Sequence, residues 1–345
     1  MNAAKLDILR NGAFIPAHPL AITQERRLDE RRQRALSRYY LAAGAEGLAV
    51  GVHSTQFAIR QRGMFEPVLR LAAEEAAAKP NTLLIAGAVG PTESAVAEAE
   101  TAKKLGYDAV LLSCGGLPNY TEKQLIERAE AVGRVLPLFG FYLQPAAGGR
   151  LLSKSYWRDL ADLPTLIAIK MAPFNRYQTL DVVRGVCESA RCDDITLYTG
   201  NDDTILADLL TPFITEANGK LVEKRIVGGL LGHWAAWAQA SVAIFKQIKA
   251  QVASGNAIPA TLLTLAAQVT ESNAAIFDAP NGFSGCIPGV HEALRRVGLL
   301  ENLLTLDPDE CLSPGQADEI ARIASAYPHL VDDAFVAEHL NEWLS

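Results

Sequence analysis

The sequence predicts an α/β protein built as a (β/α)₈ TIM barrel with a C-terminal helical extension. Three observations lead to this fold class. Short apolar runs alternate with longer segments of helical spacing, the runs number eight, and the alternation stops near residue 233 of 345. Runs that are apolar at successive positions are typical of parallel strands buried on both faces. A doubly wound sheet produces the same alternation, and the count of eight favours the barrel.

The eight predicted strands occur at similar intervals along the chain. They are residues 8–18, 47–52, 82–89, 108–114, 136–143, 165–171, 195–200 and 225–232. The segments between them carry helix spacing, as in ESAVAEAETAKKLG (93–106), and Gly44 and Gly106 stand just past predicted helix ends, where a left-handed cap is common. We therefore predict a barrel domain over residues 1–233.

The last third of the chain, residues 234–345, has no comparable strand runs. Its apolar spacing predicts helices at about 234–253, 258–276, 289–299, 315–327 and 331–342. Because no low-complexity linker separates this region from the barrel, we expect it to pack onto the barrel rather than move freely.

Composition excludes some classes of function. The formal net charge of −7 argues against nucleic acid as a main partner, and the arginine-rich run QERRLDERRQR (24–34) contains acids that indicate a solvated helix face. Five dispersed cysteines without a CxxC pair indicate reduced thiols and no metal site. The sequence has no apolar stretch long enough for a membrane span and no secretory signal at its start, so we expect a cytoplasmic protein.

Lys170 interrupts an otherwise apolar strand in PTLIAIKMAPFNRY (164–177). Burying an ammonium group is costly and lowers its pKa, and active sites of barrels lie at the carboxyl ends of the strands. A neutral amine there is a nucleophile that condenses with the carbonyl of a 2-oxo acid. The other polar or small residues at strand ends are His53, Ser54, Thr55, Tyr142, Gln144, Asn175, Gly200, Asn201, Asp202 and His233.

Each of these residues also has a structural interpretation. A lysine at a strand end is commonly a snorkelling side chain or an ion-pair partner, and Tyr142 is suited to a core position with its hydroxyl at the surface. The histidines His53 and His233 are commonly structural. The run Asn201, Asp202 and Asp203 is suited to a helix N-cap. Taken singly, no residue decides between the two interpretations.

Three motifs together resemble the dihydrodipicolinate synthase and N-acetylneuraminate lyase family. They are a tyrosine ending the fifth strand in FYLQP, a lysine ending the sixth in IAIKMAP, and a glycine followed by Asn-Asp-Asp in LYTGNDD. GYDAVLLS (106–113) and PGVHEALRRVGLL (288–300) also resemble family segments. Tyr142 and Lys170 stand 28 residues apart, which is compatible with the family's pair.

The resemblance implies class I aldolase chemistry without a separate cofactor or metal. Lys170 is expected to form the Schiff base with pyruvate or a related 2-oxo acid, and Tyr142 to transfer protons. Either Ser54 and Thr55 or His53 and Ser54 are expected at the carboxylate of the substrate, and the sequence leaves both pairs open. The predicted partner is an aldehyde, and the family implies a homodimer or homotetramer. The further predicted substrate-binding residues are Gln144, Asn175, Gly200, Asn201 and His233.

Three departures from the family pattern argue against dihydrodipicolinate synthesis itself. The turn after the second strand reads GVHSTQF (51–57) and lacks the family's second glycine and its glutamate. The segment SCGGLPNY (113–120) has no evident tyrosine pair, and Ala147 stands where the synthases carry an arginine. We therefore expect a lyase for another hydroxylated 2-oxo acid. A Schiff-base dehydratase and a catalytically silent acid-binding protein remain alternatives.

Overall fold

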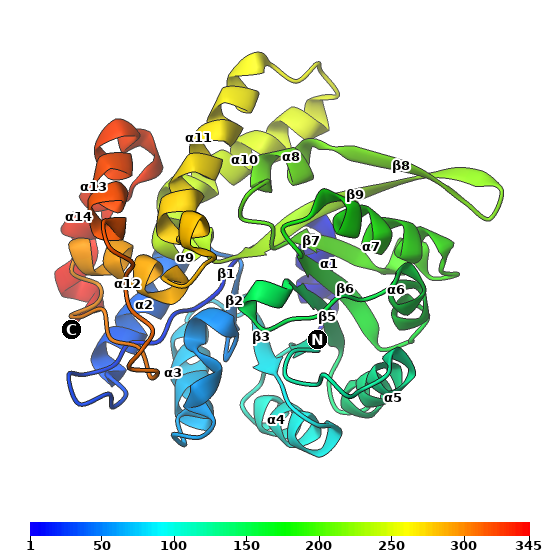
Figure 1. Ribbon diagram of the computed structural model, residues 1–345, viewed down its shortest axis with the longest axis horizontal. Helices are drawn as coiled ribbons and strands as arrows, with labels where there is room; N and C mark the ends of the chain where they lie inside the picture. Colours follow the sequence, from blue (N-terminus) through cyan, green and yellow to red (C-terminus); the bar gives the residue numbers. More distant parts are fainter.

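Eight parallel strands form a nearly closed barrel in the computed structural model, which describes all 345 residues (Figure 1). In spatial order the sheet runs β1-β9-β7-β6-β5-β4-β3-β2, and a single bridge between Ala17 and Ala49 joins the ends of β1 and β2. The predicted fold class is thus confirmed. The barrel strands are β1 (Phe14–Pro16), β2 (Gly47–Val50), β3 (Leu83–Ala88), β4 (Ala109–Ser113), β5 (Leu138–Leu143), β6 (Leu166–Ala172), β7 (Thr196–Thr199) and β9 (Lys220–Leu231).

Helices surround the barrel, and local sequence signals explain where they begin and end. Helix α5 starts in a capping box between Thr121 and Gln124. Helix α2 starts at the side chain of Asp29 and ends at Gly44, whose φ of 104° is left-handed. The surrounding helices are α2 (Glu30–Ala43), α3 (Phe65–Ala76), α4 (Thr92–Lys104), α5 (Glu122–Gly133), α6 (Lys154–Ala161), α7 (Arg176–Glu188) and α8 (Ile205–Leu210).

The predicted first strand, 8–18, was partly wrong. Its first residues belong to a helix, α1 (Ala3–Asn11), which ends at Gly12 with a φ of 87°. A Cβ on Gly12 would lie 1.9 Å from the carbonyl oxygen of Val227, so only glycine fits this turn. The hydroxyl of Tyr198 donates to Leu9 O at 2.7 Å and accepts from the Ala13 N–H at 2.9 Å. These contacts hold the end of α1 against the barrel interior.

A hairpin that the sequence analysis missed precedes the eighth barrel strand. Strand β8 (Pro212–Ala217) pairs antiparallel with the first half of β9, and the ribbon projects from the barrel (Figure 1). Asn218 and Gly219 form its turn with φ values of 53° and 78°. Asn-Gly is a strong signal for this kind of turn. The predicted run 225–232 is therefore only the second half of one longer strand.

The C-terminal region is helical, as predicted, and packs onto the barrel. The hydroxyl of Tyr39 in α2 donates to Asp332, which also accepts from the backbone N–H groups of Gln239 and Ala240. The division into two domains at residue 233 stays a prediction. The helices are α9 (His233–Ala236), α10 (Ala238–Ser254), α11 (Ala260–Ile276), α12 (Cys286–Arg296), α13 (Gln316–Ala326) and α14 (Asp333–Trp343).

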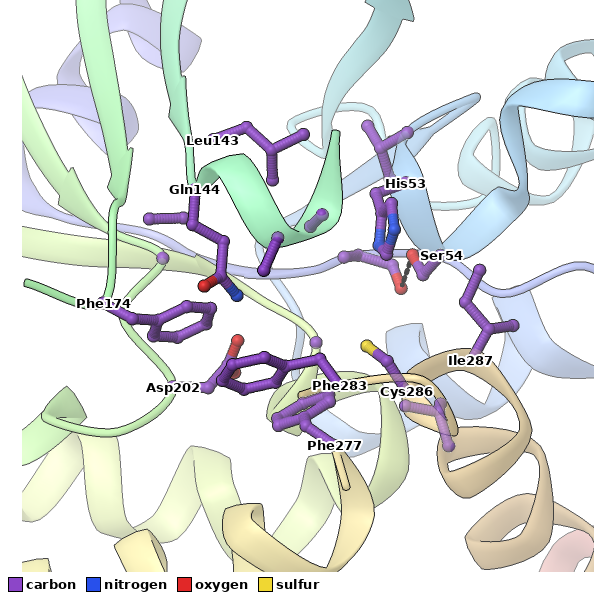
Figure 2. Close-up of a pocket in the computed structure, with 18 of the residues that line it drawn as sticks. His53, Ser54, Leu143, Gln144, Phe174, Asp202, Phe277, Phe283, Cys286 and Ile287 are labelled. Carbon is purple, nitrogen blue, oxygen red and sulfur yellow. Dashed lines mark hydrogen bonds between the residues drawn. The ribbon is translucent and has the colours of Figure 1, made fainter. Parts of the chain in front are cut away.

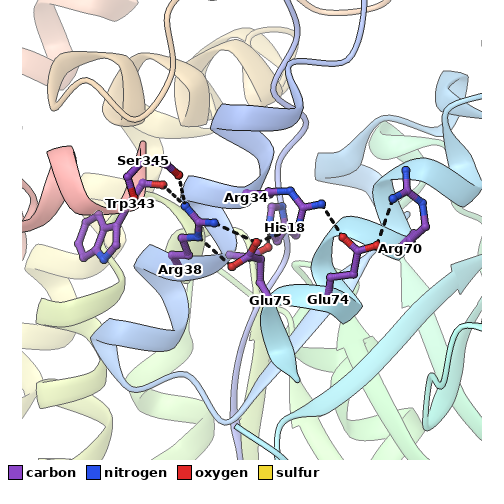
Figure 3. A network of polar contacts seen from close by, with 9 residues as sticks. His18, Arg34, Arg38, Arg70, Glu74, Glu75, Trp343 and Ser345 are labelled. Atoms are coloured by element: carbon purple, nitrogen blue, oxygen red, sulfur yellow. Dashed lines mark hydrogen bonds and ion pairs between the residues drawn. The ribbon is translucent and has the colours of Figure 1, made fainter. Parts of the chain in front are cut away.

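The arginine-rich segment joins this region to the barrel instead of lying free in solvent. Arg38 donates to the carbonyl oxygens of Trp343 and Ser345 at 2.8 and 2.9 Å and also pairs with Glu75 (Figure 3). Arg34 pairs with Glu75 as well. Three more arginines donate to carbonyl oxygens of the C-terminal region: Arg26 to Thr305, Arg31 to Leu344 and Arg32 to Gly298.

Alternation along each strand divides the core into two parts. In β5, Phe139, Phe141 and Leu143 belong to the cluster inside the barrel, whereas Leu138 and Tyr142 belong to the cluster between strands and helices. Phe141 and Tyr142 are neighbours in β5, so their side chains point to opposite faces of the strand. The one that faces inward stands on the same side as the predicted lysine. None of the helices combines the length and the apolar character needed to cross a membrane.

Candidate active site

One cavity of about 250 Å³ opens at the carboxyl ends of the barrel strands (Figure 2). We call its barrel side the strand wall, which comprises Ala17, Val52, His53, Ser54, Phe141, Leu143, Gln144, Lys170, Ala172, Gly200 and Asp202. The opposite side, the C-terminal wall, comprises Phe277, Phe283, Cys286, Ile287, Val290 and Glu310. Phe174, Ala146, Ala147 and Gly232 complete the lining.

Lys170 lies in the strand wall and is only 8% exposed. Its Nζ lies 4.5 Å from the centre of the Phe141 ring. Burial lowers the pKa of Lys170 to about 8, and the negative charge of Asp202 opposes this shift. Gly200 leaves room for the lysine, because a Cβ at that position would lie 2.4 Å from Lys170 Cε. The site thus holds an amine that loses its proton close to neutral pH.

Asp202 is the carboxyl group that couples to this lysine. Burial raises its pKa to about 7, while the His233 N–H and the charge of Lys170 oppose the shift. Its Oδ1 accepts from the backbone N–H of His233 at 3.0 Å. The expected N-cap role for this segment was wrong, because α8 begins only at Ile205 and has no side-chain cap. An acid with a pKa of about 7 and an amine with a pKa of about 8 therefore share one pocket.

The turn after β2 places two of its three predicted residues in the pocket. His53 and Ser54 line the cavity, whereas Thr55 is fully buried and does not. Ser54 Oγ donates to Ala17 O at 2.8 Å. The Thr55 hydroxyl donates to His18 O at 2.6 Å and accepts from the Gly51 N–H at 3.0 Å, so it stabilises the turn.

His53 contributes a neutral ring to the pocket. Burial and the charge of Lys170 lower its pKa to about 4, so the imidazole is uncharged at neutral pH. The backbone N–H groups of His53 and Ser54 belong to the short 3-10 helix His53–Thr55, which stands in the turn beside the cavity. The turn and the lysine thus line the same cavity.

Tyr142 does not line the pocket. Its ring packs 5.0 Å from that of Trp157 in α6, and Phe141 occupies the inward position instead. A bulge explains the change. Strands β5 and β6 are paired, and at their start Leu138 lies opposite Leu166, which is 28 residues later in the sequence. Beyond the bulge Phe141 lies opposite Lys170, which is 29 residues later. The 28-residue spacing therefore does not bring Tyr142 and Lys170 together.

The remaining predicted residues divide into two groups. Gln144 and Gly200 line the pocket. Asn175 instead caps α7, accepting from the N–H groups of Tyr177 and Gln178 at 3.0 and 3.2 Å. Asn201 accepts from the Phe174 N–H at 3.1 Å, and the His233 ring packs edge-on against Trp237. These last three residues position the site without lining its cavity.

The sequence analysis missed the C-terminal wall. Phe283 stacks on Phe174 with ring centres 5.6 Å apart and planes 11° apart. Glu310 also faces the cavity, and burial together with Asp307 raises its pKa to about 7. These residues lie in or beside loops and follow no strand or helix period. Phe174 follows the lysine strand by two residues, so it alone stood close in sequence to a predicted site residue.

Comparison with known proteins identifies the family. The model of the Dihydrodipicolinate synthetase family matches residues 12–213, which include Lys170 and Asp202. The chain belongs to this family. The matched segment spans more than half of the chain, contains the strand wall and ends before the residues of the C-terminal wall. The predicted family is confirmed.

Curated relatives include N-acetylneuraminate lyases. The chain is 27% identical to that of Citrobacter koseri over 199 residues, which cover 57% of this chain and 64% of the relative. It is 27% identical to that of Escherichia coli strain SMS-3-5 over 190 residues, or 54% of this chain and 61% of the relative. The chain therefore matches less than two thirds of the length of these relatives.

Solved structures extend the likeness in fold over nearly the whole chain. The dihydrodipicolinate synthase of Oceanobacillus iheyensis has a TM-score of 0.73 at 16% identity, covering 94% of this chain and 99% of its own. A prophage protein of E. coli K12 of the same family, solved with pyruvate, has a TM-score of 0.74 at 18% identity, covering 92% and 98%. At these identities the likeness shows the fold.

Proposed function

We propose that this chain is a carbon-carbon lyase of the class I aldolase type, acting on a hydroxylated 2-oxo acid through a Schiff base on Lys170. One observation carries the proposal: a buried lysine with a lowered pKa lies in the cavity at the carboxyl ends of the strands. Membership of the family and the likeness to N-acetylneuraminate lyases support it.

In this mechanism the neutral amine of Lys170 attacks the C2 carbonyl of the 2-oxo acid. The carbonyl oxygen takes up a proton, and the resulting carbinolamine loses water to give an iminium. The iminium accepts the electron pair of the C3–C4 bond when that bond breaks. We propose that the backbone N–H groups of His53 and Ser54 bind the substrate carboxylate, since both residues belong to the turn that lines the cavity together with Lys170.

The proton that leaves the C4 hydroxyl needs an acceptor within the pocket. The family resemblance assigns this role to Tyr142, but that side chain packs against α6. We propose Asp202 instead, because it lines the cavity with Lys170 and has a pKa of about 7. As Asp202 takes the proton, C3–C4 breaks, the aldehyde leaves, and an enamine remains. Protonation of the enamine at C3 and addition of water release pyruvate and the free lysine.

Two alternatives use the same pocket. A dehydratase forms the same iminium but eliminates water and gives a 2-oxo product with an unchanged carbon count. A silent protein binds an acid without forming the iminium. Dihydrodipicolinate synthesis is disfavoured, since Ala147 replaces the arginine and Arg150 donates instead to the carbonyl oxygens of Leu117 and Tyr120. The homodimer or homotetramer and the cytoplasmic location stay predictions.

Borohydride reduction in the presence of pyruvate tests the proposal. We expect a stable adduct on Lys170 by peptide mass analysis, and none in Lys170→Met. Lys249→Met is a matched control, because Lys249 also lies over a phenylalanine ring, 5.4 Å from the centre of Phe245, but outside this cavity. If folded protein gives no adduct with any of a panel of 2-oxo acids, the silent alternative is correct.

A further inference from the structure

Aromatic and aliphatic side chains dominate the part of the pocket that faces Lys170. The rings of Phe174, Phe277 and Phe283 lie together on one side of the cavity (Figure 2). Ile287 and Val290, from the first turns of α12, extend the same surface. A molecule joined to the lysine-bound carbon fragment must therefore pack against rings and methyl groups.

The stacked pair is fixed by its surroundings. Phe174 and Phe283 have φ values of 47° and 68°, in the left-handed region that bulky residues rarely adopt. Asn201 holds the first through the Phe174 N–H, and the Phe283 N–H donates to the carbonyl oxygen of Asp278 at 3.0 Å. Unusual backbone of this kind persists when its surroundings require it, and such residues cluster at ligand sites.

Polar anchors hold the loop between α11 and α12 that carries Phe283. The Asp278 carboxylate accepts from Gly285 N at 3.0 Å, Ser313 Oγ at 2.6 Å and Asn281 Nδ2 at 2.7 Å. These bonds connect the loop to the segment before α13, which also supplies Glu310. The aromatic surface is therefore built in advance of substrate.

The charges in the pocket disfavour an anionic partner. Lys170 is the one residue of the lining that is charged as a cation at neutral pH, because His53 is uncharged there. The iminium keeps one positive charge, which the carboxylate of the bound 2-oxo acid offsets. Asp202 and Glu310 are both acidic. An acceptor aldehyde with its own carboxylate would meet these acids and no second cation.

The same surface disfavours a sugar. Hydroxyl groups placed against phenylalanine rings lose their bonds to water without replacement, at a cost for each group. Asp202 Oδ1 already accepts from His233, and under the proposed mechanism its other oxygen serves the reacting hydroxyl. Since the proposed mechanism assigns His53 and Ser54 to the substrate carboxylate, Gln144 and Glu310 are the other polar side chains of the lining that remain for an acceptor. Two side chains are few for a chain of several hydroxyls.

We propose that the acceptor of this pocket is an uncharged aromatic, or similarly planar and apolar, aldehyde. This inference rests on the proposed function, because the aldehyde is the partner of the lysine-bound 2-oxo acid. The aromatic surface of Phe174, Phe277 and Phe283 is then the specificity determinant, and the aldehyde carbonyl lies toward Asp202.

An aldehyde panel with pyruvate as the donor tests the inference. Benzaldehyde represents an uncharged aromatic, succinic semialdehyde an anionic chain, and N-acetylmannosamine a sugar. We expect kcat/KM for benzaldehyde to exceed both others by at least about tenfold, as hydrophobic pockets discriminate by such factors. Phe283→Ala should lose about tenfold toward benzaldehyde, and Phe283→Leu should restore part of it. Tyr177→Ala, an aromatic that is 81% exposed on α7, is the matched control.

Pyruvate trapping in the same samples separates the two proposals. If the Lys170 adduct forms but a sugar or anionic aldehyde is preferred, or no aldehyde reacts, the aromatic acceptor is overturned and the Schiff base stands. If no adduct forms, the proposed function fails and the acceptor inference fails with it. A loss in Phe283→Ala equal for all three aldehydes also contradicts the inference, since it indicates a general structural effect.

Discussion

The two walls of the pocket are built in different ways. Residues of the strand wall, such as Lys170 and Gly200, stand on or directly after barrel strands, where backbone hydrogen bonds to neighbouring strands fix them. The C-terminal wall comes from α12 and the loops beside it, which Asp278 holds through side-chain hydrogen bonds. The family model matches the first wall and ends before the second.

Because the two walls are supported separately, one fold can keep a reaction while its substrate changes. The nucleophile needs a placement accurate to a fraction of an ångström, which a strand supplies. The second wall has only to present a surface of the right shape and polarity. It lies on another part of the chain, so it can vary without moving Lys170. The proposed division is chemistry on the strand wall and choice of acceptor on the C-terminal wall.

The largest expected effect comes from Asp202→Asn. Loss of a general acid-base group typically costs about 10²- to 10⁴-fold, and we expect cleavage to fall by about 10²- to 10³-fold. The nearby negative charge raises the pKa of Lys170, so its removal lowers that pKa further. The rise of pyruvate adduct formation with pH should therefore shift to lower pH. The rate of pyruvate adduct formation is measured between pH 6 and 10 by stopping the reaction with borohydride. Asp203→Asn is the control, because it removes the neighbouring carboxylate.

Stability gives a second measurement on the same variant. The pKa of the Asp202 carboxyl is 3.8 in the unfolded chain and about 7 in the folded protein. Between these two pH values the folded protein therefore binds one more proton than the unfolded chain. Its contribution to the free energy of unfolding therefore falls as pH rises through this window. Asp202→Asn should flatten that fall. An unaltered pH profile of denaturant midpoints would show that Asp202 is not buried as described.

Gly200→Ala should have a smaller effect on the same wall. The new Cβ would lie 2.4 Å from Lys170 Cε and 3.0 Å from Ala172 Cβ, so the lysine must move. A misplacement of about 1 Å costs on the order of 10²-fold in a positioned reaction, and we expect adduct formation to slow by about 10- to 100-fold. Timed borohydride quenching measures the rate. A normal rate would mean that Lys170 does not extend across Gly200.

Tyr142→Phe should have the smallest effect, because its ring packs on Trp157 outside the pocket. We expect less than about a twofold change in cleavage and in adduct formation, since a general acid-base role would be worth at least about 10²-fold. Phe141→Leu, which removes the ring beneath Lys170 Nζ, should change adduct formation more. A fall of about 10²-fold in Tyr142→Phe would show that β5 turns this side chain toward the lysine.

Much of the fold and the strand wall could be predicted from the sequence. Strands buried on both faces stand out as apolar runs, and Lys170 is conspicuous because it is charged within one of them. The separation of Tyr142 from Lys170 could not be predicted, because one extra residue in β6, Ile167, changes which β6 side chains share the inward face with Phe141. Asp202 was assigned to a cap, since the sequence did not show that α8 starts three residues later.

The C-terminal wall could not be predicted for another reason. Phe283 and Glu310 occupy segments without periodicity, and their approach to the barrel mouth depends on contacts between parts of the chain far apart. The prediction of the first strand was partly wrong for a similar reason. The residues ILRN belong to helix α1, which ends at Gly12, and the conformation of Gly12 depends on its contact with the Val227 backbone. Local patterns predict elements, whereas these positions depend on tertiary packing.

The pairing of β1 with β9 joins two strands that are synthesised far apart in time. Phe14 lies in register with Gly229, whereas the neighbourhood of β2 meets β1 through the Glu46 N–H to Phe14 O at 3.1 Å and the His18 N–H to Ala49 O at 2.8 Å. On a ribosome, the first strand therefore leaves the exit tunnel about 200 residues before the strand that it joins. Contacts so distant in sequence form slowly, and an unpaired edge is open to wrong partners meanwhile. The apolar FIP segment of β1 thus waits longer for one of its neighbouring strands than any other strand of the barrel does.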